Sequence, residues 1–591
     1  MSAPTIDVRR EPARPPTAPV MMDPSRYGSL GELLEDALIQ YKSETALIEV
    51  DRNKEQKRLR YLDVKREAAR ITHWLAERGV GPNDRVAILM SNQARWLLSA
   101  YAVFHRGAVL VPLDYKLTAK EQEALLAHAK PKVLITEHAL MRRLGDVAGA
   151  EVLVSEAKEG TSYARPHARF EDLAAHDDPP PRQPRERGDV ATIVYSSGTG
   201  GVAKGCLLPH EAYLSQLEAL MELFPMRPGH RYFSILPTNH AIDFMVGFVG
   251  PFSCGATVIH QRSLRPEFLS STMQSYEVTH MALVPLILSA FETSIDDRLS
   301  DSPRWARRAV SMLSGLNEML TSRAPNADLS RRLLSPIHDA FGGKLELLFC
   351  GGAFVDRARA ERFYRLGLPV VIGYGLTEAC TVATVNDLRP FRADSVGRAV
   401  KGVELRIHDP GPDGVGEVWL RGPTVMLGYL DEPELTKETI TEDGWLRTGD
   451  LGWLDAAHHL HLVGRSKNLI VTAGGKNVYP EDVESAFESL PVAELAVLAS
   501  GYVWPRAQRI EDERLILVIR EQRGNGVAAP SRERVLRELR ELNQRLAEHK
   551  RVRGVLFVGE DLPRTASMKI KRRALADQLT SERSPRDLVE L

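Results

Sequence analysis

The sequence predicts an α/β protein built from helix-covered, mostly parallel sheets, with a smaller second domain. Over the first half of the chain, segments with the apolar period of a helix alternate with short β-branched runs. This alternation is typical of parallel sheets that carry helices on both faces. The 591 residues are too many for one hydrophobic core. After about residue 465 the helix and strand signals restart in smaller units, which places a domain boundary there.

The N-terminal elements follow from local signals. Residues 1–25 are expected to form a disordered tail, because they are rich in Pro and Arg and lack the apolar segment of a signal peptide. Two predicted helices, 29–42 and 118–129, begin with a Ser or Thr three residues before a Glu, the spacing of a capping box. The other predictions are helices over 62–80 and 96–107 and strands over 84–90, 108–113, 131–137 and 190–194.

The rest of the chain continues this pattern in larger blocks. The apolar stretch 241–259 is almost long enough to span a membrane, but Asp243 lies inside it and Pro251 interrupts it. It therefore predicts a buried helix followed by a core strand. A helical region is expected over 303–340, a strand over 344–350 and an amphipathic helix over 532–551. The two domains are expected to span 26–465 and 466–591.

Composition and charge exclude several classes of protein. Apolar residues make up 43% and charged residues 26% of the chain, as in ordinary soluble globular proteins. The net charge of −1 gives no reason to expect a nucleic-acid or anionic-membrane partner. The four cysteines, Cys206, Cys254, Cys350 and Cys380, have no metal-ligand or redox spacing. Reduced thiols in a cytoplasmic protein without a transmembrane segment are the expectation.

The segment YSSGTGGVAKG at 195–205 has the composition of a phosphate-binding loop. Its glycines leave backbone N–H groups accessible, its hydroxyl groups are donors, and Lys204 adds a mobile positive charge. It is not a P-loop, because Ala203 and Gly205 stand where that motif needs a glycine and a Ser or Thr. The loop is expected to join two strands, and a plain surface loop is the alternative for the segment taken alone.

Further motifs follow in a fixed order: CGGAFV at 350–355, GYGLTEA at 373–379, GEVWLRGPTVMLGY at 416–429, DGWLRTGDLGWLD at 443–455, GRSKNLIVTAGGKNVYPEDVE at 464–484 and PRTASMKIKRRAL at 563–575. Each is a weak signal by itself. In this order, over about residues 30–580, the chain resembles the adenylate-forming superfamily, in particular its long-chain fatty acyl-CoA synthetases. The resemblance implies a β-barrel-like subdomain and a small, mobile α+β C-terminal domain.

The resemblance also implies the reaction and its cofactors. ATP and Mg²⁺ would convert a carboxylic acid to an acyl-AMP, which coenzyme A would then take up as a thioester. Bringing two anions together makes such catalysis mostly a matter of neutralisation and alignment. The residues implied at the β- and γ-phosphates are Ser196, Ser197, Gly198, Thr199 and Lys204. Glu378 would hold Mg²⁺, a cation that prefers carboxylate and phosphate oxygens, and Thr377 would donate to the α-phosphate.

Other roles are implied for the nucleoside, the acid and the thiol. Tyr374 would stack on adenine, Asp450 would accept from the ribose hydroxyls, and Arg465 would bind ribose or phosphate. Lys569 would bridge the carboxylate and the α-phosphate, although it also belongs to a basic run that could simply be solvated. The remaining implied residues are Gly351, Gly352, Ala353 and Gly375 at the nucleotide, His240 and Gly373 at the acid, Lys467 at the hinge, and Gly474 and Gly475 at the thiol tunnel.

The substrate is expected to be an apolar, medium- or long-chain acid. No acidic residue is identified for an α-amino group, Asp243 being a weak candidate. Two alternatives remain open: transfer of the acyl group to an acyl-carrier protein or an internal hydroxyl, and a non-catalytic nucleotide-binding protein. The oligomeric state is left open as well. Three departures from the family pattern, Gly200, Ala203 and Met568, predict a loop that holds ATP loosely and a slow closure of the small domain.

Overall fold

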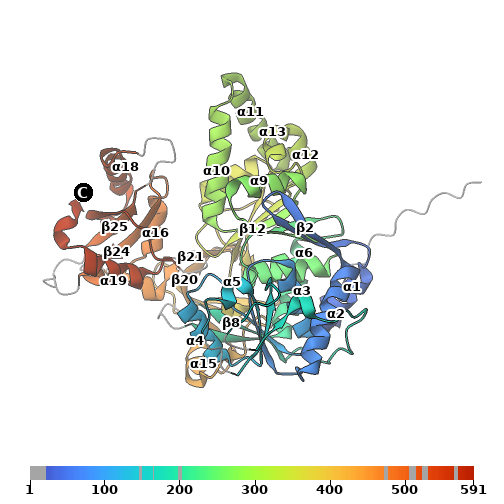
Figure 1. Ribbon diagram of the computed structural model, residues 1–591. Helices are drawn as coiled ribbons and strands as arrows, with labels where there is room; N and C mark the ends of the chain where they lie inside the picture. The colour runs from blue at the N-terminus through green and yellow to red at the C-terminus, as the bar shows by residue number, and fades with distance from the viewer. Residues whose placement is uncertain are drawn as a thin grey trace, which may run out of the picture.

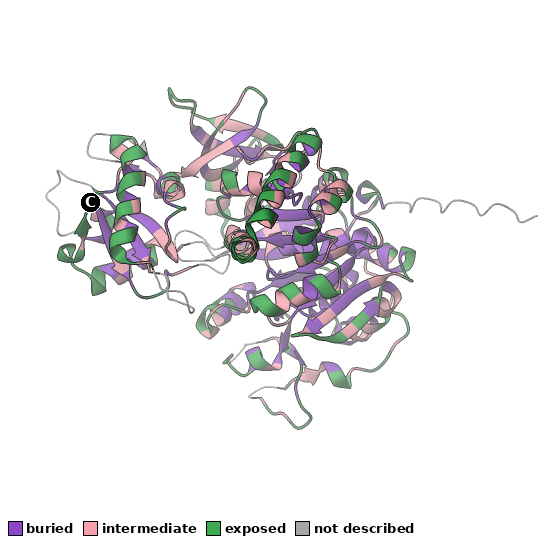
Figure 2. Cartoon of the chain, turned by 90° about the horizontal axis from the view of Figure 1, so that it is seen from above, coloured by how far each residue is buried: buried purple, intermediate pink, exposed green. Residues whose placement is uncertain are grey.

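The computed structural model describes residues 22–145, 149–163, 166–196, 203–471, 477–504, 514–521, 530–564 and 570–591. Two large sheets with helices around them form the main body, and a smaller sheet-rich part carries the C-terminus (Figure 1). Strands are buried in the middle of these layers, and the outer faces of the helices are exposed (Figure 2). The expected α/β class, with mostly parallel sheets, is confirmed.

The first large sheet has eight strands in the order β19-β9-β8-β4-β3-β5-β6-β7. All its neighbouring strands are parallel except at the β8–β9–β19 end. The strands are β3 (Arg85–Leu89), β4 (Val109–Pro112), β5 (Val133–Glu137), β6 (Glu151–Ser155), β7 (Ala168–Arg169), β8 (Val190–Ser196), β9 (Lys204–Pro209) and β19 (Gly428–Tyr429). Strands β8 and β9 are antiparallel neighbours, so the glycine loop does join two strands, as predicted.

The second large sheet has nine strands in the order β16-β15-β14-β13-β12-β10-β11-β1-β2. Its central strands, from β14 to β1, are parallel. The strands are β1 (Thr45–Asp51), β2 (Lys54–Arg60), β10 (Arg231–Ser234), β11 (Thr257–Gln261), β12 (His280–Leu283), β13 (Leu347–Gly351), β14 (Val370–Tyr374), β15 (Thr384–Val385) and β16 (Arg398–Ala399).

Helices join the two sheets into one body. Helix α3 (Ala94–His105) is buried along almost its whole length, and its Trp96, Tyr101 and Phe104 belong to a hydrophobic cluster with residues of both sheets. The other helices and short turns of this body are η1 (Pro24–Arg26), α1 (Leu30–Gln40), α2 (Tyr61–Glu77), α4 (Ala119–Ala129), α5 (His138–Met141), η2 (Phe170–Asp172), α6 (His210–Leu223), α7 (Ala241–Phe244), η3 (Met245–Val249), α8 (Gly250–Ser253), α9 (Pro266–Ser275), α10 (Pro285–Ser300), α11 (Arg304–Thr321), α12 (Ala327–Leu333), α13 (Ser335–Ala340), α14 (Arg357–Arg365), η4 (Thr377–Ala379) and α15 (Pro433–Thr439).

The part expected to be barrel-like is a four-stranded antiparallel sheet. Its strands run in the order β17 (Glu404–His408), β18 (Gly416–Arg421), β20 (Leu446–Leu454) and β21 (Leu460–Arg465). The end of β21 leads into the short turn η5 (Ser466–Asn468) and the strand pair β22 (Ile470–Val471) and β23 (Asn477–Val478). The predicted boundary near residue 465 therefore falls at the end of this sheet, and it stays a prediction.

The C-terminal part has its own mixed sheet, β24 (Glu494–Ala499), β25 (Leu515–Arg520), β26 (Gly554–Val558) and β27 (Val589–Glu590). Alternate residues of β25 enter different hydrophobic clusters: Leu517 packs on one face and Val518 on the other. This alternation is what a strand needs when both faces of its sheet are covered. The covering elements are α16 (Pro480–Ala486), α17 (Ser500–Val503), α18 (Arg532–Arg545), η6 (Glu548–Lys550), α19 (Arg572–Glu582) and η7 (Pro585–Asp587).

Several local predictions can be compared with the structure. The capping box at Thr118 and Glu121 is confirmed. At the start of α1, Ser29 accepts from the Glu32 N–H, but Glu32 accepts from the N–H of Gly28 rather than from Ser29, so this cap is not reciprocal. Helix α18 ends at Arg545, six residues before the predicted end. Within the predicted tail, Met22 is buried and Pro24–Arg26 forms a 3-10 helix, so the packed chain begins before residue 26.

The stretch 241–259 is a buried helical segment followed by β11, as expected. In the described part of the chain, no helix is both long and apolar enough to cross a membrane. All four cysteines are buried and free.

Candidate active site

Tyr374, Asp450 and Arg465 come together where the second large sheet meets the four-stranded sheet. Tyr374 is the last residue of β14, and Asp450 in β20 is paired in register with Arg465 in β21. The Tyr374 hydroxyl donates to Asp450 Oδ2 at 2.8 Å, and Arg465 Nε lies 2.7 Å from Asp450 Oδ1. Asp450 is only 6% exposed, so these two donors compensate for the burial of its charge.

The electrostatics of this cluster follow from burial and from the Asp450 charge. Burial, and then the neighbouring carboxylate, hold the pKa of Tyr374 well above its usual range, so the hydroxyl keeps its proton and can donate. Burial alone would lower the pKa of Arg465, but Asp450, Tyr374 and Glu378 together outweigh it and the pKa is raised. The cluster therefore presents a fixed anion beside a permanent cation.

Glu378 and Lys204 lie on either side of Tyr429. The Tyr429 hydroxyl donates to Glu378 Oε1 at 3.0 Å, and Lys204 Nζ lies 5.2 Å from the centre of the Tyr429 ring. The backbone fixes both neighbours: Tyr429 pairs with β9, the strand that Lys204 begins, and Met426 N–H donates to the Glu378 carbonyl. Burial and the Glu378 charge raise the pKa of Tyr429, which keeps it a donor.

Tyr429 was not identified from the sequence as a site residue. It closes the motif GEVWLRGPTVMLGY, and a tyrosine at the end of an ordered motif is the signal that could have drawn attention to it. Thr377, next to Glu378, begins the turn η4.

Close backbone packing brings the predicted glycine segments together. Gly351 and Gly373 are neighbours across β13 and β14. A Cβ atom on Gly375 would lie 1.8 Å from the carbonyl oxygen of Thr381, so no other residue fits without moving the backbone. Gly352 has φ of +81°, a left-handed conformation that favours glycine, and it is exposed together with Ala353. These segments lie at the carboxyl ends of parallel strands, the usual place of a ligand site in an α/β sheet.

His240 stands at the N-cap of α7, and its Nε2 lies 3.3 Å from Asp114 Oδ2. Burial would raise the pKa of Asp114, but His240 and Lys116 together outweigh it and lower the pKa. Asp243, three residues further on, is fully buried and accepts from the hydroxyls of Tyr232, Ser234 and Thr238. Burial raises the pKa of Asp243 to about 6, and three internal donors already satisfy it, which argues against a role in binding an amino group.

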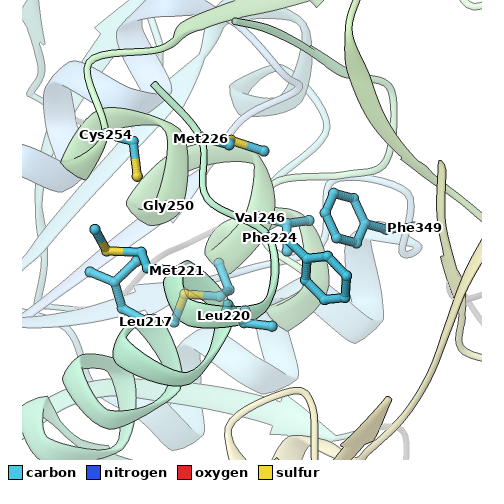
Figure 3. Close-up of a pocket in the computed structure, with 10 residues that line it drawn as sticks. Leu217, Leu220, Met221, Phe224, Met226, Val246, Gly250, Cys254 and Phe349 are labelled. Atoms are coloured by element: carbon cyan, nitrogen blue, oxygen red, sulfur yellow. The ribbon is translucent and has the colours of Figure 1, made fainter. Parts of the chain in front are cut away.

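An apolar cavity of about 30 Å³ lies between α6, η3 and β13 (Figure 3). Phe224 and Phe349 meet edge to face at one side of it, with ring centres 5.4 Å apart. Phe349 lies two residues before Gly351 in β13, so the cavity is next to the glycine segments. The residues that line it carry no charge: Leu217, Leu220, Met221, Phe224, Met226, Met245, Val246, Gly250, Cys254 and Phe349.

The remaining predicted site residues fall into two groups. Two of them are described: Ser196, the last residue of β8, is paired with Lys204, and Lys467 is exposed in η5, just after Arg465. The loop residues Ser197, Gly198, Thr199 and Gly200, the tunnel residues Gly474 and Gly475, and Met568 and Lys569 lie outside the described residues.

Comparison with known proteins identifies the family. A model described as "AMP-binding enzyme" matches residues 34–430. The chain belongs to this family. A feruloyl-CoA synthase from Amycolatopsis sp is 31% identical to this AMP-binding enzyme over 74% of the chain and 79% of the relative. A 3-[(3aS,4S,7aS)-7a-methyl-1,5-dioxo-octahydro-1H-inden-4-yl]propanoyl:CoA ligase from Mycobacterium tuberculosis is 31% identical over 92% of the chain and 97% of the relative.

Solved structures share the fold of this AMP-binding enzyme. An anthranilate CoA ligase in complex with anthranoyl-AMP matches 94% of this chain and 99% of its own, with a TM-score of 0.74 and 22% identity. ATP-bound MatB from Rhodopseudomonas palustris matches 93% of this chain and 99% of its own, with a TM-score of 0.71 and 24% identity.

Proposed function

We propose that this AMP-binding enzyme is an acid–CoA ligase that forms an acyl-AMP from an apolar carboxylic acid and passes the acyl group to coenzyme A. One observation carries the proposal, the position of two groups of side chains at the ends of strands. They are the Tyr374–Asp450–Arg465 cluster and the Lys204–Tyr429–Glu378 group. Glycines in these strands permit a close approach to the backbone. The relatives named above as CoA synthases and ligases support the same reaction.

The residues of the site fit ATP and Mg²⁺. Asp450 retains acceptor capacity for ribose hydroxyls, because a carboxylate offers about four lone-pair sites and two are in use. Lys204 and Arg465 are the cations for phosphate oxygens. Glu378 is the carboxylate for Mg²⁺, which commonly takes one or two carboxylates and completes its shell with water and phosphate. Bound Mg²⁺ would neutralise phosphate charge during attack by the acid.

Each residue then has a part in aligning the reactants. Tyr429 holds the Glu378 carboxylate by a hydrogen bond, which fixes the position of the metal ligand before ATP arrives. We assign the nucleoside to Tyr374, Gly351, Gly352, Ala353 and Gly375, the α-phosphate to Thr377, and the remaining phosphates to Lys204 and the loop 196–199. Lys569 is assigned to the contact between the carboxylate and the α-phosphate, on the resemblance alone.

The apolar character of the acid rests on the cavity behind Gly351. Its lining has no charged group to bind a second carboxylate or an amine. At about 30 Å³ it does not hold a long acyl chain as it stands. Met221, Met226 and Met245 can rearrange with little cost, because methionine has three rotatable bonds and no branch. His240 and Gly373 are assigned to the mouth of this cavity.

The second half-reaction is assigned to the C-terminal part. Lys467 follows the last strand of the four-stranded sheet. A change of backbone angles there would rotate the C-terminal part of the chain relative to the main body. We keep Gly474 and Gly475 as the residues for the thiol tunnel. The nearest alternative is transfer to an acyl-carrier protein or an internal hydroxyl, and the alternative of another class is a nucleotide-binding protein without catalysis.

The decisive experiment measures pyrophosphate release with ATP, Mg²⁺ and a panel of acids, namely straight-chain fatty acids of several lengths, cinnamic-type acids and a dicarboxylic acid. Thioester formation is then followed after adding coenzyme A or a holo-carrier protein. We expect release with the apolar acids and a thioester with coenzyme A. Release with the dicarboxylic acid alone would contradict the apolar substrate, and ATP binding without any release would favour the non-catalytic alternative.

A further inference from the structure

Helix α11 turns its apolar face to solvent. Trp305 is 73% exposed, Met312 71% and Met319 65%. With Leu316 and Leu320, which are 37% and 53% exposed, these residues lie along one side of the helix, because their separations of seven, four and three positions keep them on one face. From Trp305 to Met319 this apolar face is about 21 Å long at 1.5 Å per residue. Leu286 in α10, 53% exposed, is another large apolar side chain of the same hairpin.

The opposite face of α11, which packs against the protein, is mixed: Val310 packs against a core cluster, but the most buried side chains are polar. Ser314, Asn317 and Thr321 are buried there. Asn317 donates to the carbonyl of Arg365 at 3.2 Å and accepts from Ser330 at 2.8 Å, which fastens α11 to α14 and α12. A surface helix of a soluble protein usually turns its large apolar side chains inward, whereas the largest ones of α11 face solvent. The orientation is fixed by hydrogen bonds, so the apolar face cannot turn inward without breaking them.

Most of the charged groups of the α10–α11 hairpin (residues 285–323) that are not held in ion pairs are positive. Glu292 and Asp296 are engaged by arginines of α14, and Glu318 pairs with Arg365. Within the described residues, the groups of this hairpin that form no ion pair are Asp297, Asp301, Arg298, Arg304, Arg307, Arg308 and Arg323.

Two of these arginines lie beside the apolar face. Arg308 is three residues after Trp305 and four before Met312, and Arg323 is four residues after Met319. Both are exposed, as is Arg304 next to the tryptophan. A tryptophan, methionines and leucines with arginines along their edge match the composition of helices that lie in the interface of a membrane. The hairpin projects from the main body (Figure 1), and the apolar side chains of this face stay exposed to solvent among the described residues.

We propose that the α11 face, Trp305, Met312, Leu316, Met319 and Leu320 with Arg304, Arg308 and Arg323, binds the surface of an anionic phospholipid membrane. The apolar side chains enter the boundary between headgroups and acyl chains, and the arginines bind lipid phosphates. The net charge of −1 does not indicate this site, because it sums the charges of the whole chain, including the acidic residues far from this local excess of arginine. Such binding is peripheral, on one leaflet, and independent of the reaction proposed above.

The test is co-sedimentation of the full chain with vesicles of phosphatidylcholine alone and of equal parts phosphatidylcholine and phosphatidylglycerol. We expect sedimentation with the anionic vesicles, weakened by high salt because surface charges are screened. The double change Trp305→Ser with Met312→Ser removes the apolar contact, and Arg304→Glu with Arg308→Glu reverses the charge. The arginine reversal should lower the partition coefficient about tenfold or more, because basic residues bind the anionic surface. The Trp305 and Met312 change should lower it by a similar factor, because it removes the apolar area that enters the membrane.

Matched controls are available on the same chain. Ile39→Ser removes an apolar side chain of α1 that is 53% exposed. Arg537→Glu with Arg540→Glu reverses two exposed arginines on α18, which has no apolar outer face. Both controls should sediment as the wild type does, and pyrophosphate release without vesicles should be equal in all variants. Equal sedimentation of the α11 variants, no sedimentation of the wild type, or concentration-dependent dimers that the Trp305 variant abolishes would overturn the proposal.

Discussion

At the residue scale, Asp450 accepts from two side chains that come from different sheets, Tyr374 and Arg465. Replacing it by Asn keeps the shape but removes the charge that pairs with Arg465. Loss of a hydrogen bond to a charged group costs about 1.5–3 kcal/mol, so we expect the KM for ATP to rise about tenfold to a hundredfold. Pyrophosphate release against ATP concentration measures this.

The control for this change is Glu442→Gln, which makes the same acid-to-amide change at an exposed position outside the cluster. It should leave the KM unchanged. An Asp450→Asn enzyme with the wild-type KM for ATP would contradict the assignment of Asp450 to the ribose.

Tyr429→Phe tests whether the Glu378 carboxylate needs its hydroxyl partner. The change keeps the ring beside Lys204 and removes only the 3.0 Å bond. We expect a roughly tenfold higher Mg²⁺ concentration for half-maximal pyrophosphate release, because a freely rotating carboxylate is a less organised ligand. Tyr276→Phe removes an equivalent tyrosine–glutamate bond, to Glu55 on the surface. If both variants respond to Mg²⁺ alike, Tyr429 has no part in positioning the metal ligand.

At the element scale, the apolar cavity that we propose for the acid lies where α6 and η3 meet β13, and Phe349 is the residue that the strand contributes. Phe349→Leu enlarges the cavity, so kcat/KM should shift by several-fold toward longer or bulkier acids. Phe363→Leu makes the same change at a fully buried position of the other core cluster. Both should cost about 1 kcal/mol of stability, and only the first should change acid preference. An equal preference in both variants would place the acid elsewhere.

At the scale of the whole molecule, buried histidines link folding to pH. Burial, and then the neighbouring His230, lower the pKa of His280 to about 3, and burial lowers that of His260 to about 3. The unfolded imidazole titrates near 6.5. The unfolded state therefore binds more protons between these values, and stability is fully present above about pH 6.5 and is lost as the pH falls toward 3.

We therefore expect the melting temperature of the first unfolding transition of His280→Asn to fall less than that of the wild type between neutral and mildly acidic pH. This holds even if the substitution lowers the melting temperature at every pH. His458→Asn is the matched change at an exposed histidine, and it should leave the pH dependence as in the wild type. The same dependence in both variants would mean that His280 does not contribute to the acid sensitivity of the fold.

The sequence by itself determined the fold class and the order of the site motifs. Alternation of apolar periods is a local property, so it predicted the parallel sheets and the strands on either side of the glycine loop. Only the tertiary structure decided which motifs meet. Glu378 and Tyr429 are 51 residues apart, and Tyr374 and Asp450 are 76. Such contacts depend on how sheets pack, which no local pattern records. The sequence also did not show that the apolar face of α11 is turned to solvent. Periodicity indicates that a helix has an apolar side, but not whether that side faces the core or the solvent.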